Sequence, residues 1–397
     1  MLQAKFKNGK LLTLFQFTKG EIEKLRSDSD FYCPACNEKV IIKAGPKMIA
    51  HFAHQSTASC HMNERGEGEY HEKGKILLYQ WLLRQGLDVS IEAYISPIKQ
   101  RADILVKIKG KKIAIEFQSS RIPIQDIAKR TYGYLQEGIQ PIWILGANLL
   151  QRTGKNMLKV DHFTLQFLQQ YNQTPAPFLY FFDPESTTFI TAANLFQTNN
   201  NRMIADLTIR KLDKITFLDL FKFPTMSYDL IVEVWKKAKS RFRLYQPRRL
   251  YGKELAWYKW IYYKGTHREY LSSLIYLPVI AQYRMNTPPW DWQSRICLEV
   301  IDPLPKGSAF SLLTCRFQLQ KSLSKHVPPL IKSTRDPILE YLQLLSYFQI
   351  IKQKSSNVFI KCNEVPYYTS LEDAIVGDKK IMNELSQLFK SKYEHDS

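Results

Sequence analysis

The chain has 397 residues, of which 45% are hydrophobic and 13% aromatic, and it carries a formal net charge of +19. This length and composition predict two or three globular domains and exclude a disordered chain. No apolar run approaches the roughly 18 residues of a membrane span. The basic balance indicates a polyanionic partner. Nucleic acid is a simpler choice than an anionic membrane surface, because no amphipathic anchor is evident.

The first residues predict a β-hairpin rather than a targeting segment. They turn at Asn8-Gly9 and lack the long apolar region and small-residue cleavage site of a signal peptide. Three scattered cysteines have no disulfide-scaffold spacing and are expected to be buried reduced thiols: Cys297, Cys315 and Cys362. We therefore expect a cytoplasmic protein.

A cluster of cysteines and histidines near the N-terminus has the spacing of zinc ligands. The Cys33-x2-Cys36 knuckle is followed by two histidines and a third cysteine, which gives five candidates for a four-coordinate site. We favour Cys33, Cys36, His54 and Cys60, with His51 as the substitute. The ion would be structural, because so short a segment has little core of its own. The alternative is a reduced cysteine pair without metal.

Residues 101–118 predict a second β-hairpin, with an acidic site. Two segments that alternate apolar and polar residues flank a polar turn at 109–112, so Gln118 would pair with Asp103. Because strand side chains alternate, Asp103, Glu116 and Gln118 would leave the same face, with the two carboxylates about 5–8 Å apart. Such a pair suits a hard divalent cation such as Mg²⁺. The alternative is an exposed face with solvated acids.

The segments around this hairpin predict a compact α/β unit. In chain order they are a helix at 69–85, a strand at 87–95, the hairpin, a helix at 124–137 and a buried strand at 141–145. The first helix carries His71 and Lys75 near its N-terminal end, and the second carries Arg130. The order is therefore helix, three-strand meander, helix, strand.

This order and these residues resemble the PD-(D/E)xK nuclease superfamily. More narrowly, residues 1–150 resemble the competence protein CoiA family, whose members combine a zinc-ribbon-like N-terminus with a nuclease-like domain. The matching segments, in the order of the family, are Cys33-Pro34-Ala35-Cys36, His51-Phe52-Ala53-His54, Glu69-Tyr70-His71 with Lys75, Gln100-Arg101-Ala102-Asp103-Ile104, Ile115-Glu116-Phe117-Gln118 and Trp143-Ile144-Leu145.

The resemblance implies a nuclease centre and a role in genetic transformation, on incoming DNA around the recombination step. Asp103 and Glu116 would hold Mg²⁺ or Mn²⁺, and Gln118 stands where the superfamily has lysine. An amide can orient water but supplies no positive charge, so Lys75 or His71 would have to provide it. The candidate catalytic residues are Asp103, Glu116, Gln118, Lys75, His71 and Glu69.

Residues 236–268 hold eleven Lys and Arg against one acid, interleaved with eight aromatic residues. Cations neutralise phosphates and aromatic faces stack on unpaired bases, so this mixture suits single-stranded nucleic acid. The alternative is a pair of helices whose aromatics are core and whose charges are solvated. Lys75 is a further candidate phosphate contact, and the candidate DNA-binding arginines are Arg130, Arg241, Arg243, Arg248 and Arg249.

The fold class that we expect is an α/β nuclease-like core with a small N-terminal zinc-binding segment and a mostly helical basic C-terminal region. The expected parts are a zinc-ribbon-like segment at 1–60, the nuclease-like domain at 61–150, a basic and mostly helical DNA-binding region at 151–280, and an α+β module with winged-helix-like element order at 281–397. In the last part, Asp336-Pro337 predicts a helix start, followed by strands at 358–361 and 366–369.

The expected function is metal-dependent endo- or exonucleolytic processing of single-stranded or branched DNA, with recombination proteins as further partners. The alternative is a non-catalytic DNA-binding or recombinase-assisting factor that keeps a degenerate nuclease fold. The Asp103/Glu116 pair favours the enzyme, and the missing lysine favours the binding factor.

Overall fold

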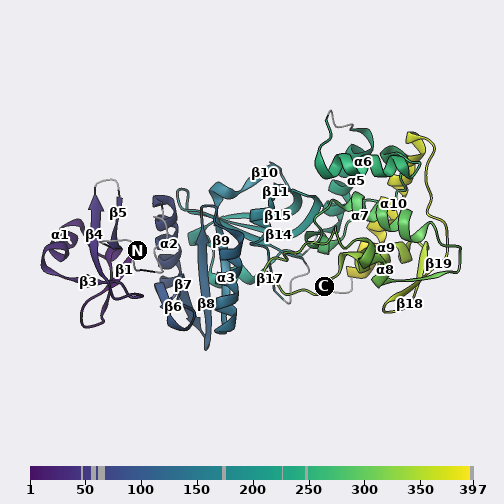
Figure 1. Ribbon diagram of the computed structural model, residues 1–397. Coiled ribbons are helices and arrows are strands. Elements are labelled where there is room, and N and C mark those ends of the chain that lie inside the picture. The colour runs from purple at the N-terminus through teal and green to yellow at the C-terminus, as the bar shows by residue number, and fades with distance from the viewer. Residues whose placement is uncertain are drawn as a thin grey trace.

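The computed structural model describes residues 1–45, 48–54, 60, 68–171, 176–225, 227–245 and 249–393, with side chains to residue 390. Figure 1 shows three parts in a row: a small N-terminal unit, a large central sheet and a mainly helical C-terminal part. Among these described residues, no helix has the length and apolar character needed to cross a membrane.

The N-terminal unit is a five-stranded sheet with the order β2-β1-β3-β4-β5 and one helix, α1 (Lys19–Asp28). Its strands are β1 (Gln3–Lys5), β2 (Leu11–Thr13), β3 (Phe31–Tyr32), β4 (Lys39–Gly45) and β5 (Met48–His54). The turn predicted at Asn8-Gly9 joins β1 and β2, with Gly9 at φ +85°, a conformation that favours glycine. The unit has a small core around Leu14 and Phe52, which also contains Cys33.

The central part is a nine-stranded sheet with the order β10-β11-β15-β14-β13-β9-β8-β7-β6. Its strands are β6 (Asp88–Ile95), β7 (Gln100–Ile108), β8 (Lys111–Gln118), β9 (Ile139–Gly146), β10 (Gln151–Gly154), β11 (Met157–Lys159), β13 (Leu179–Asp183), β14 (Thr188–Asn199) and β15 (Arg202–Lys211). Strand β9 runs parallel to both β8 and β13, and the other neighbours are antiparallel. The predicted meander, crossover helix and final strand are all present.

Helix α2 (Glu69–Leu83) packs on one face of this sheet through an apolar cluster that includes Leu78 and Ile115. Gly74 allows close approach of the helix to strand β8, because a Cβ atom there would lie 2.1 Å from Cε1 of Phe117. The close approach brings the polar first turns of α2 next to the end of β8.

Helix α3 (Ile124–Gln136) connects β8 to β9 and covers the opposite face. Its Ile127 packs in one cluster with Trp143, and its Tyr134 packs in another with Ala102 and Ala114. A parallel strand pair needs such a crossover connection, so the position of α3 follows from the strand order.

The turn between β7 and β8 is shorter than the sequence predicted. Lys109 and Gly110 both have positive φ, 46° and 75°, as a two-residue hairpin turn of the tight primed type requires. Extending the pairing of the two strands places Asp103 opposite Glu116, so the predicted pairing of Asp103 with Gln118 is wrong. The register differs by two residues, an even number, which by itself leaves each side chain on its expected face.

The sheet continues well beyond residue 150, where the sequence placed the start of a mostly helical region. Strands β10, β11, β13, β14 and β15 add the second half of the sheet, and β15 occupies a segment expected to be helical. Met203, Ile204 and Ala205 form a continuous buried apolar run within β15. Such a run has no strand periodicity, so it does not distinguish a strand from a buried helix.

The C-terminal part is mainly helical. Its longer helices are α5 (Tyr228–Leu244), α6 (Gly252–Tyr263), α7 (Pro289–Arg295), α8 (Leu312–Gln318), α9 (Pro337–Tyr347) and α10 (Leu371–Tyr393). As predicted, Asp336 caps α9 by accepting hydrogen bonds from the N–H groups of Ile338 and Leu339. Cys297 and Cys315 are buried thiols as expected, whereas Cys362 is exposed.

Three short strands complete the C-terminal part, in the order β16 (Ala309–Ser311), β19 (Val358–Lys361) and β18 (Ile351–Ser355). Strand β19 is the one predicted at 358–361, but the second predicted strand, 366–369, is not a strand, and β19 pairs with β18 instead. A two-stranded parallel pair, β12 (Gln169–Gln170) with β17 (Leu330–Ile331), connects this part to the central part.

The remaining short helices are distributed over all three parts. They are α4 (His162–Leu165), η1 (Leu14–Gln16), η2 (Ser96–Ile98), η3 (Ala147–Leu149), η4 (Leu212–Lys214), η5 (Phe217–Phe221), η6 (Arg268–Tyr270), η7 (Ile280–Arg284) and η8 (Ile296–Ile301).

Candidate functional site

The N-terminal unit gathers a group of side chains that could hold a metal ion. The ligand atoms of Cys33, Cys36, His54 and Cys60 all lie within 4.8 Å of one another. These are the four residues that the sequence favoured. His51 is not in the group, and its Nδ1 atom lies 3.0 Å from the carbonyl oxygen of Ile49 in its own strand.

The local backbone explains how this group forms. The knuckle lies between β3 and β4, where the N–H of Asn37 donates to the carbonyl of Cys33 and brings Cys36 beside it. His54 ends strand β5, and its Nε2 atom lies 3.3 Å from Sγ of Cys36. Burial, together with the nearby thiols of Cys60 and Cys33, raises the pKa of Cys36 to about 12. Burial also lowers the pKa of His54, which keeps its imidazole neutral and able to ligate.

A second group of polar side chains forms an acidic centre on the central sheet. Glu116 of β8 is buried, and its Oε1 accepts a hydrogen bond from the Tyr134 hydroxyl. Its Oε2 accepts from Nη2 of Arg130, which also donates to the carbonyl of Arg101 at 3.0 Å. Burial raises the pKa of Glu116 to about 7 and the nearby Asp103 adds to this rise, although Arg130 and Tyr134 oppose it. Helix α3 therefore supplies both donors to this carboxylate.

The second carboxylate of the centre, Asp103, has different partners. Its Oδ2 accepts a hydrogen bond from the N–H of Phe117 at 2.9 Å and lies 3.9 Å from Nε2 of His71 on helix α2. The other ring nitrogen of His71 lies 3.3 Å from the Ser119 hydroxyl. Asp103 thus lies towards α2, whereas Glu116 is held by α3.

The side chains of Asp103 and Glu116 were predicted to lie on the same face of the hairpin. This requires side chains to alternate regularly between the two faces of the sheet, and strand β7 interrupts that alternation. Ile104 packs in the cluster beneath α2, but Ala102 packs with Tyr134 of α3. Strict alternation would place these two residues on the same face. The break brings the carboxylate of Asp103 to the main chain of β8.

A divalent cation does not fit the acidic centre in this arrangement. Both oxygens of Glu116 already accept hydrogen bonds, and one of these comes from a guanidinium cation. Within the described residues, Asp103 and Glu116 do not belong to any group of three or more acidic, His or Cys ligand atoms as close as those of the cysteine cluster. In the described centre, Glu116 is already paired with a cation of the protein, Arg130.

The comparisons with known proteins agree with this division of the chain. Models of the N-terminal, nuclease-like and C-terminal domains of competence protein CoiA match residues 14–63, 67–225 and 230–375. The chain belongs to the competence protein CoiA family. Competence protein CoiA of Bacillus subtilis (strain 168) is 27% identical over 356 residues, which cover 88% of this chain and 94% of the relative. No solved structure matches.

Membership of the family supports a role in competence, and the match to the nuclease-like domain includes the acidic centre. It also extends to residue 225, so that the whole of the nine-stranded sheet lies within it. The boundary that we expected at residue 150 therefore lies inside the matched range.

Two other candidate residues of the nuclease-like domain are engaged elsewhere. Lys75 is fully buried, and its Nζ atom lies 2.9 Å from Oε1 of Glu92, so it is not placed to contact a phosphate. The Gln118 amide donates to the carbonyl of Ser120 at 2.8 Å and is bonded to the loop that follows β8. Glu69 is exposed at the first position of α2.

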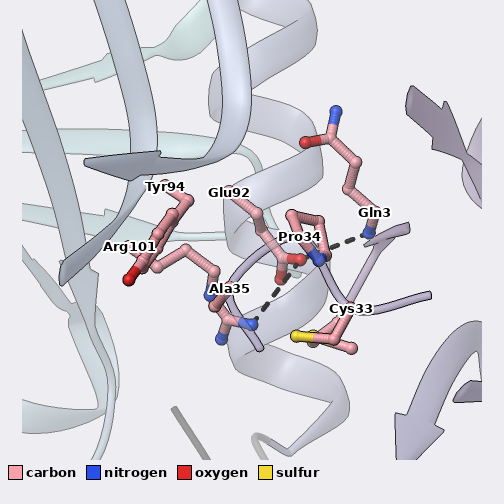
Figure 2. Close-up of a pocket in the computed structure, with 8 residues that line it drawn as sticks. Gln3, Cys33, Pro34, Ala35, Glu92, Tyr94 and Arg101 are labelled. Atoms are coloured by element: carbon pink, nitrogen blue, oxygen red, sulfur yellow. Dashed lines mark hydrogen bonds and ion pairs between the residues drawn. The ribbon is translucent and has the colours of Figure 1, made fainter. Parts of the chain in front are cut away.

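Glu92, which the sequence analysis did not single out, joins the N-terminal unit to the nuclease-like domain. Its Oε2 accepts hydrogen bonds from the N–H groups of Leu2 and Gln3, at 2.7 and 3.3 Å. Figure 2 shows Glu92 between Gln3 and Arg101, at a pocket that Cys33 of the metal-ligand knuckle also lines. An acid inside a predicted strand was the only sequence signal for this junction, because the N–H groups of Leu2 and Gln3 are about 90 residues away along the chain.

The basic region divides into buried and exposed residues. Arg243 is 3% exposed, and its Nε and Nη2 atoms donate to the two oxygens of Asp378, both at 2.9 Å. It is therefore a structural residue, and its predicted role in DNA binding is wrong. Arg241 and Arg249 are exposed, and Arg248 lies outside the described residues.

The aromatic residues of this region divide in the same way. Trp257 is buried in the core, whereas four tyrosines are 61–84% exposed: Tyr245, Tyr251, Tyr262 and Tyr263. The expectation of core aromatics thus holds for part of the region. The exposed tyrosines, together with Arg241 and Arg249, remain available to a partner.

Proposed function

We propose that this protein binds DNA during competence and processes it at the acidic centre of the nuclease-like domain. The single observation that carries the proposal is the gathering of Asp103, Glu116, His71 and Arg130 from two strands and both flanking helices into one buried centre. Buried titratable groups with a shifted pKa are characteristic of functional sites. The net charge of +19 supports DNA as the partner.

Within this proposal, His71 is the group best placed to move a proton. The hydrogen bond between Nδ1 and the Ser119 hydroxyl, at 3.3 Å, orients the ring, and Nε2 then lies 3.9 Å from Oδ2 of Asp103. A general base has to be held in one orientation to accept a proton from attacking water. The resemblance to the PD-(D/E)xK superfamily supports a catalytic role for Asp103 and Glu116 in the same centre.

Replacement of the two carboxylates tests the proposed activity. Asp103→Asn and Glu116→Gln keep the shape of each side chain, and each is expected to lower DNA cleavage at least about 100-fold, since proton transfer and charge placement at the centre are lost. Cleavage is measured on single-stranded, duplex and branched DNA with Mg²⁺ or Mn²⁺. Glu137→Gln, an exposed acid just after α3, is the matched control and should cleave like the wild type.

A second candidate function is a DNA-binding or recombinase-assisting factor without catalysis. It is favoured by the donors that already occupy both oxygens of Glu116 and by the engagement of Lys75 with Glu92. If the wild type cleaves no DNA in either metal and Asp103→Asn supports transformation like the wild type, this second function replaces the first.

The exposed basic side chains make a separate prediction about DNA affinity. The double replacement Arg241→Gln and Arg249→Gln is expected to weaken DNA binding and to flatten its salt dependence. For each phosphate of a single strand that the protein no longer neutralises, the slope of log K against log salt becomes shallower by about 0.7. Fluorescence anisotropy at several salt concentrations measures both quantities. Lys111→Gln with Lys112→Gln removes the same charge from the exposed start of strand β8 and serves as the control. An equal decrease in affinity in the two double variants would mean that net charge alone matters.

A further inference from the structure

We propose that a cavity between strands β14 and β15 and the segment 215–224 holds one nucleotide of a bound DNA single strand. The cavity has a volume of about 260 Å³, and the described residues that line it do not include those of the acidic centre. This inference rests on the proposed function in DNA binding and adds a second, separate site to it.

One wall of the cavity is a face of the two paired strands β14 and β15 (Figure 1). Phe189 lies opposite Arg210, and Thr191 lies opposite Thr208. Side chains alternate along a strand, so these four share one face, whereas Ile190 packs in the core on the other face. All four line the cavity. The strands therefore present an aromatic ring, two hydroxyls and a guanidinium to one space.

The opposite wall comes from η5 and the residues that follow it. Leu220 and Phe223 make this wall apolar, and the ring of Phe223 packs against that of Phe178, with centroids 4.5 Å apart. Lys222 lies at the exposed rim, where its Nζ atom donates to Oδ1 of Asp219 at 2.8 Å. The cavity thus has apolar walls and a cationic rim.

The charges around the cavity favour an anionic ligand. The only described acidic residue that lines it, Asp219, is already engaged, because its two oxygens accept from Lys222 and from the N–H of Thr216. Arg210 is exposed, and among the residues that the structure describes it has neither an ion pair nor a side-chain hydrogen bond. A guanidinium forms paired hydrogen bonds with a phosphate, so Arg210 is the group that a phosphate would engage.

A nucleotide matches this combination of size and chemistry. The volume lies just below the range of roughly 300–1,000 Å³ of pockets for drug-sized ligands, so it suits one nucleotide rather than a DNA helix. A base stacks on aromatic and apolar side chains and bonds through its polar edge, while cations hold the phosphate. The bases of a duplex are stacked and paired inside it, so only an unpaired strand offers a base to a cavity.

The cavity lies on the same level of the sheet as the acidic centre. Phe117, whose N–H bonds to a carboxylate of that centre, is in register with Ile144, Tyr180, Thr191 and Thr208 on successive neighbouring strands. At a strand spacing of about 4.8 Å, the two threonines lie roughly 14–19 Å from Phe117. A single strand of a few nucleotides is long enough to reach both sites.

The first test removes the unpaired cation of the cavity. Affinity of the full-length protein for a fluorescent single-stranded oligonucleotide is measured by anisotropy, without added Mg²⁺ or Mn²⁺. Arg210→Gln is expected to bind at least about 10-fold more weakly, because a charged hydrogen-bonded contact with a phosphate is lost. The matched control is Arg152→Gln, which removes the same charge from an exposed position of β10 in the same sheet and should bind like the wild type. Equal affinities of the two variants would overturn the proposal.

The second test fills the cavity without changing its charge. Thr208→Phe is expected to weaken oligonucleotide binding by at least about 10-fold, because the base is excluded. Ile209→Phe adds the same ring at the neighbouring position of β15, which is 50% exposed and lies outside the cavity, and should bind like the wild type. Thermal unfolding shows whether Thr208→Phe folds, and if it does not, Thr191→Met takes its place, since a flexible side chain adapts to the space. Unchanged affinity in a folded, filled variant would contradict the proposal.

A free nucleotide is the other source of the same ligand chemistry. Deoxyadenosine monophosphate should displace the fluorescent strand only at concentrations at least about 100-fold above those of an unlabelled oligonucleotide, since a strand has further phosphate contacts outside the cavity. Equal potency of the two competitors would show that the cavity takes a free nucleotide and would overturn the assignment to a strand.

These measurements separate the cavity from the proposed function. If the wild type binds and cleaves DNA, but Arg210→Gln and the filled variant bind it as their controls do, the cavity proposal fails and the proposed function stands. If the wild type neither binds nor cleaves DNA, the proposed function itself fails.

Discussion

Replacing Cys36 with serine is expected to unfold the N-terminal unit and to release a bound zinc ion. Three thiols and an imidazole within 4.8 Å match a closed tetrahedral zinc site, which leaves no open position for substrate. Apparent binding free energies of structural zinc reach about 10–16 kcal/mol, because ion binding and folding are one equilibrium in such small units. Metal analysis should find about one equivalent in the wild type and none in Cys36→Ser, and thermal unfolding should show that this unit unfolds early in the variant.

Two further replacements make this prediction specific to the four ligands. Cys362→Ser removes an exposed cysteine far from the cluster and should change neither metal content nor stability. His51→Ala should retain the ion and His54→Ala should lose it, since only His54 belongs to the group. Well-folded wild-type protein without zinc would show that the cluster is a set of reduced thiols.

Replacing Asp378 with alanine is expected to destabilise the C-terminal part by about 3–5 kcal/mol, because it leaves buried cations without their counter-ion. Asp378 accepts two hydrogen bonds from Arg243, and Nζ of Lys239 lies 3.4 Å from it. Both cations are almost completely buried. Urea denaturation measures the change, and Glu372→Ala, an exposed acid on the same helix, provides the control. Equal unfolding midpoints for the two variants would contradict this stabilising role of Asp378.

The same carboxylate predicts how stability depends on pH. Burial alone would raise the pKa of Asp378, but Lys239 and Arg243 together hold it below the usual value of 3.8. A carboxylate whose pKa is lower in the folded state stabilises the protein above its unfolded pKa and ceases to do so as the pH falls through its folded pKa. The difference in stability between wild type and Asp378→Ala should therefore be full near neutral pH and shrink in acid below about pH 4.

The sequence by itself determined the order of elements from α2 to β9 and the candidate members of the Cys/His cluster that could hold a metal ion. Both rest on short-range patterns. The alternation of β7 and β8 and the helical stripe of α2 are readable within a few residues. Likewise, the two-residue spacing of Cys33 and Cys36 keeps their thiols close together, and only a few His and Cys residues follow as further candidate ligands.

The tertiary structure alone decided which charged residues are free to act. The carboxylate beside Lys75 lies 17 residues away, and the one beside Arg243 lies 135 residues away. Burying an unpaired charge is costly, so a buried charged side chain needs a partner of opposite charge. Neither this cost nor the spacing of residues in the sequence identifies the partner. Arg130 shows the same principle. It was predicted to contact DNA, but in the fold it neutralises Glu116, because the crossover helix brings the two together across the sheet face.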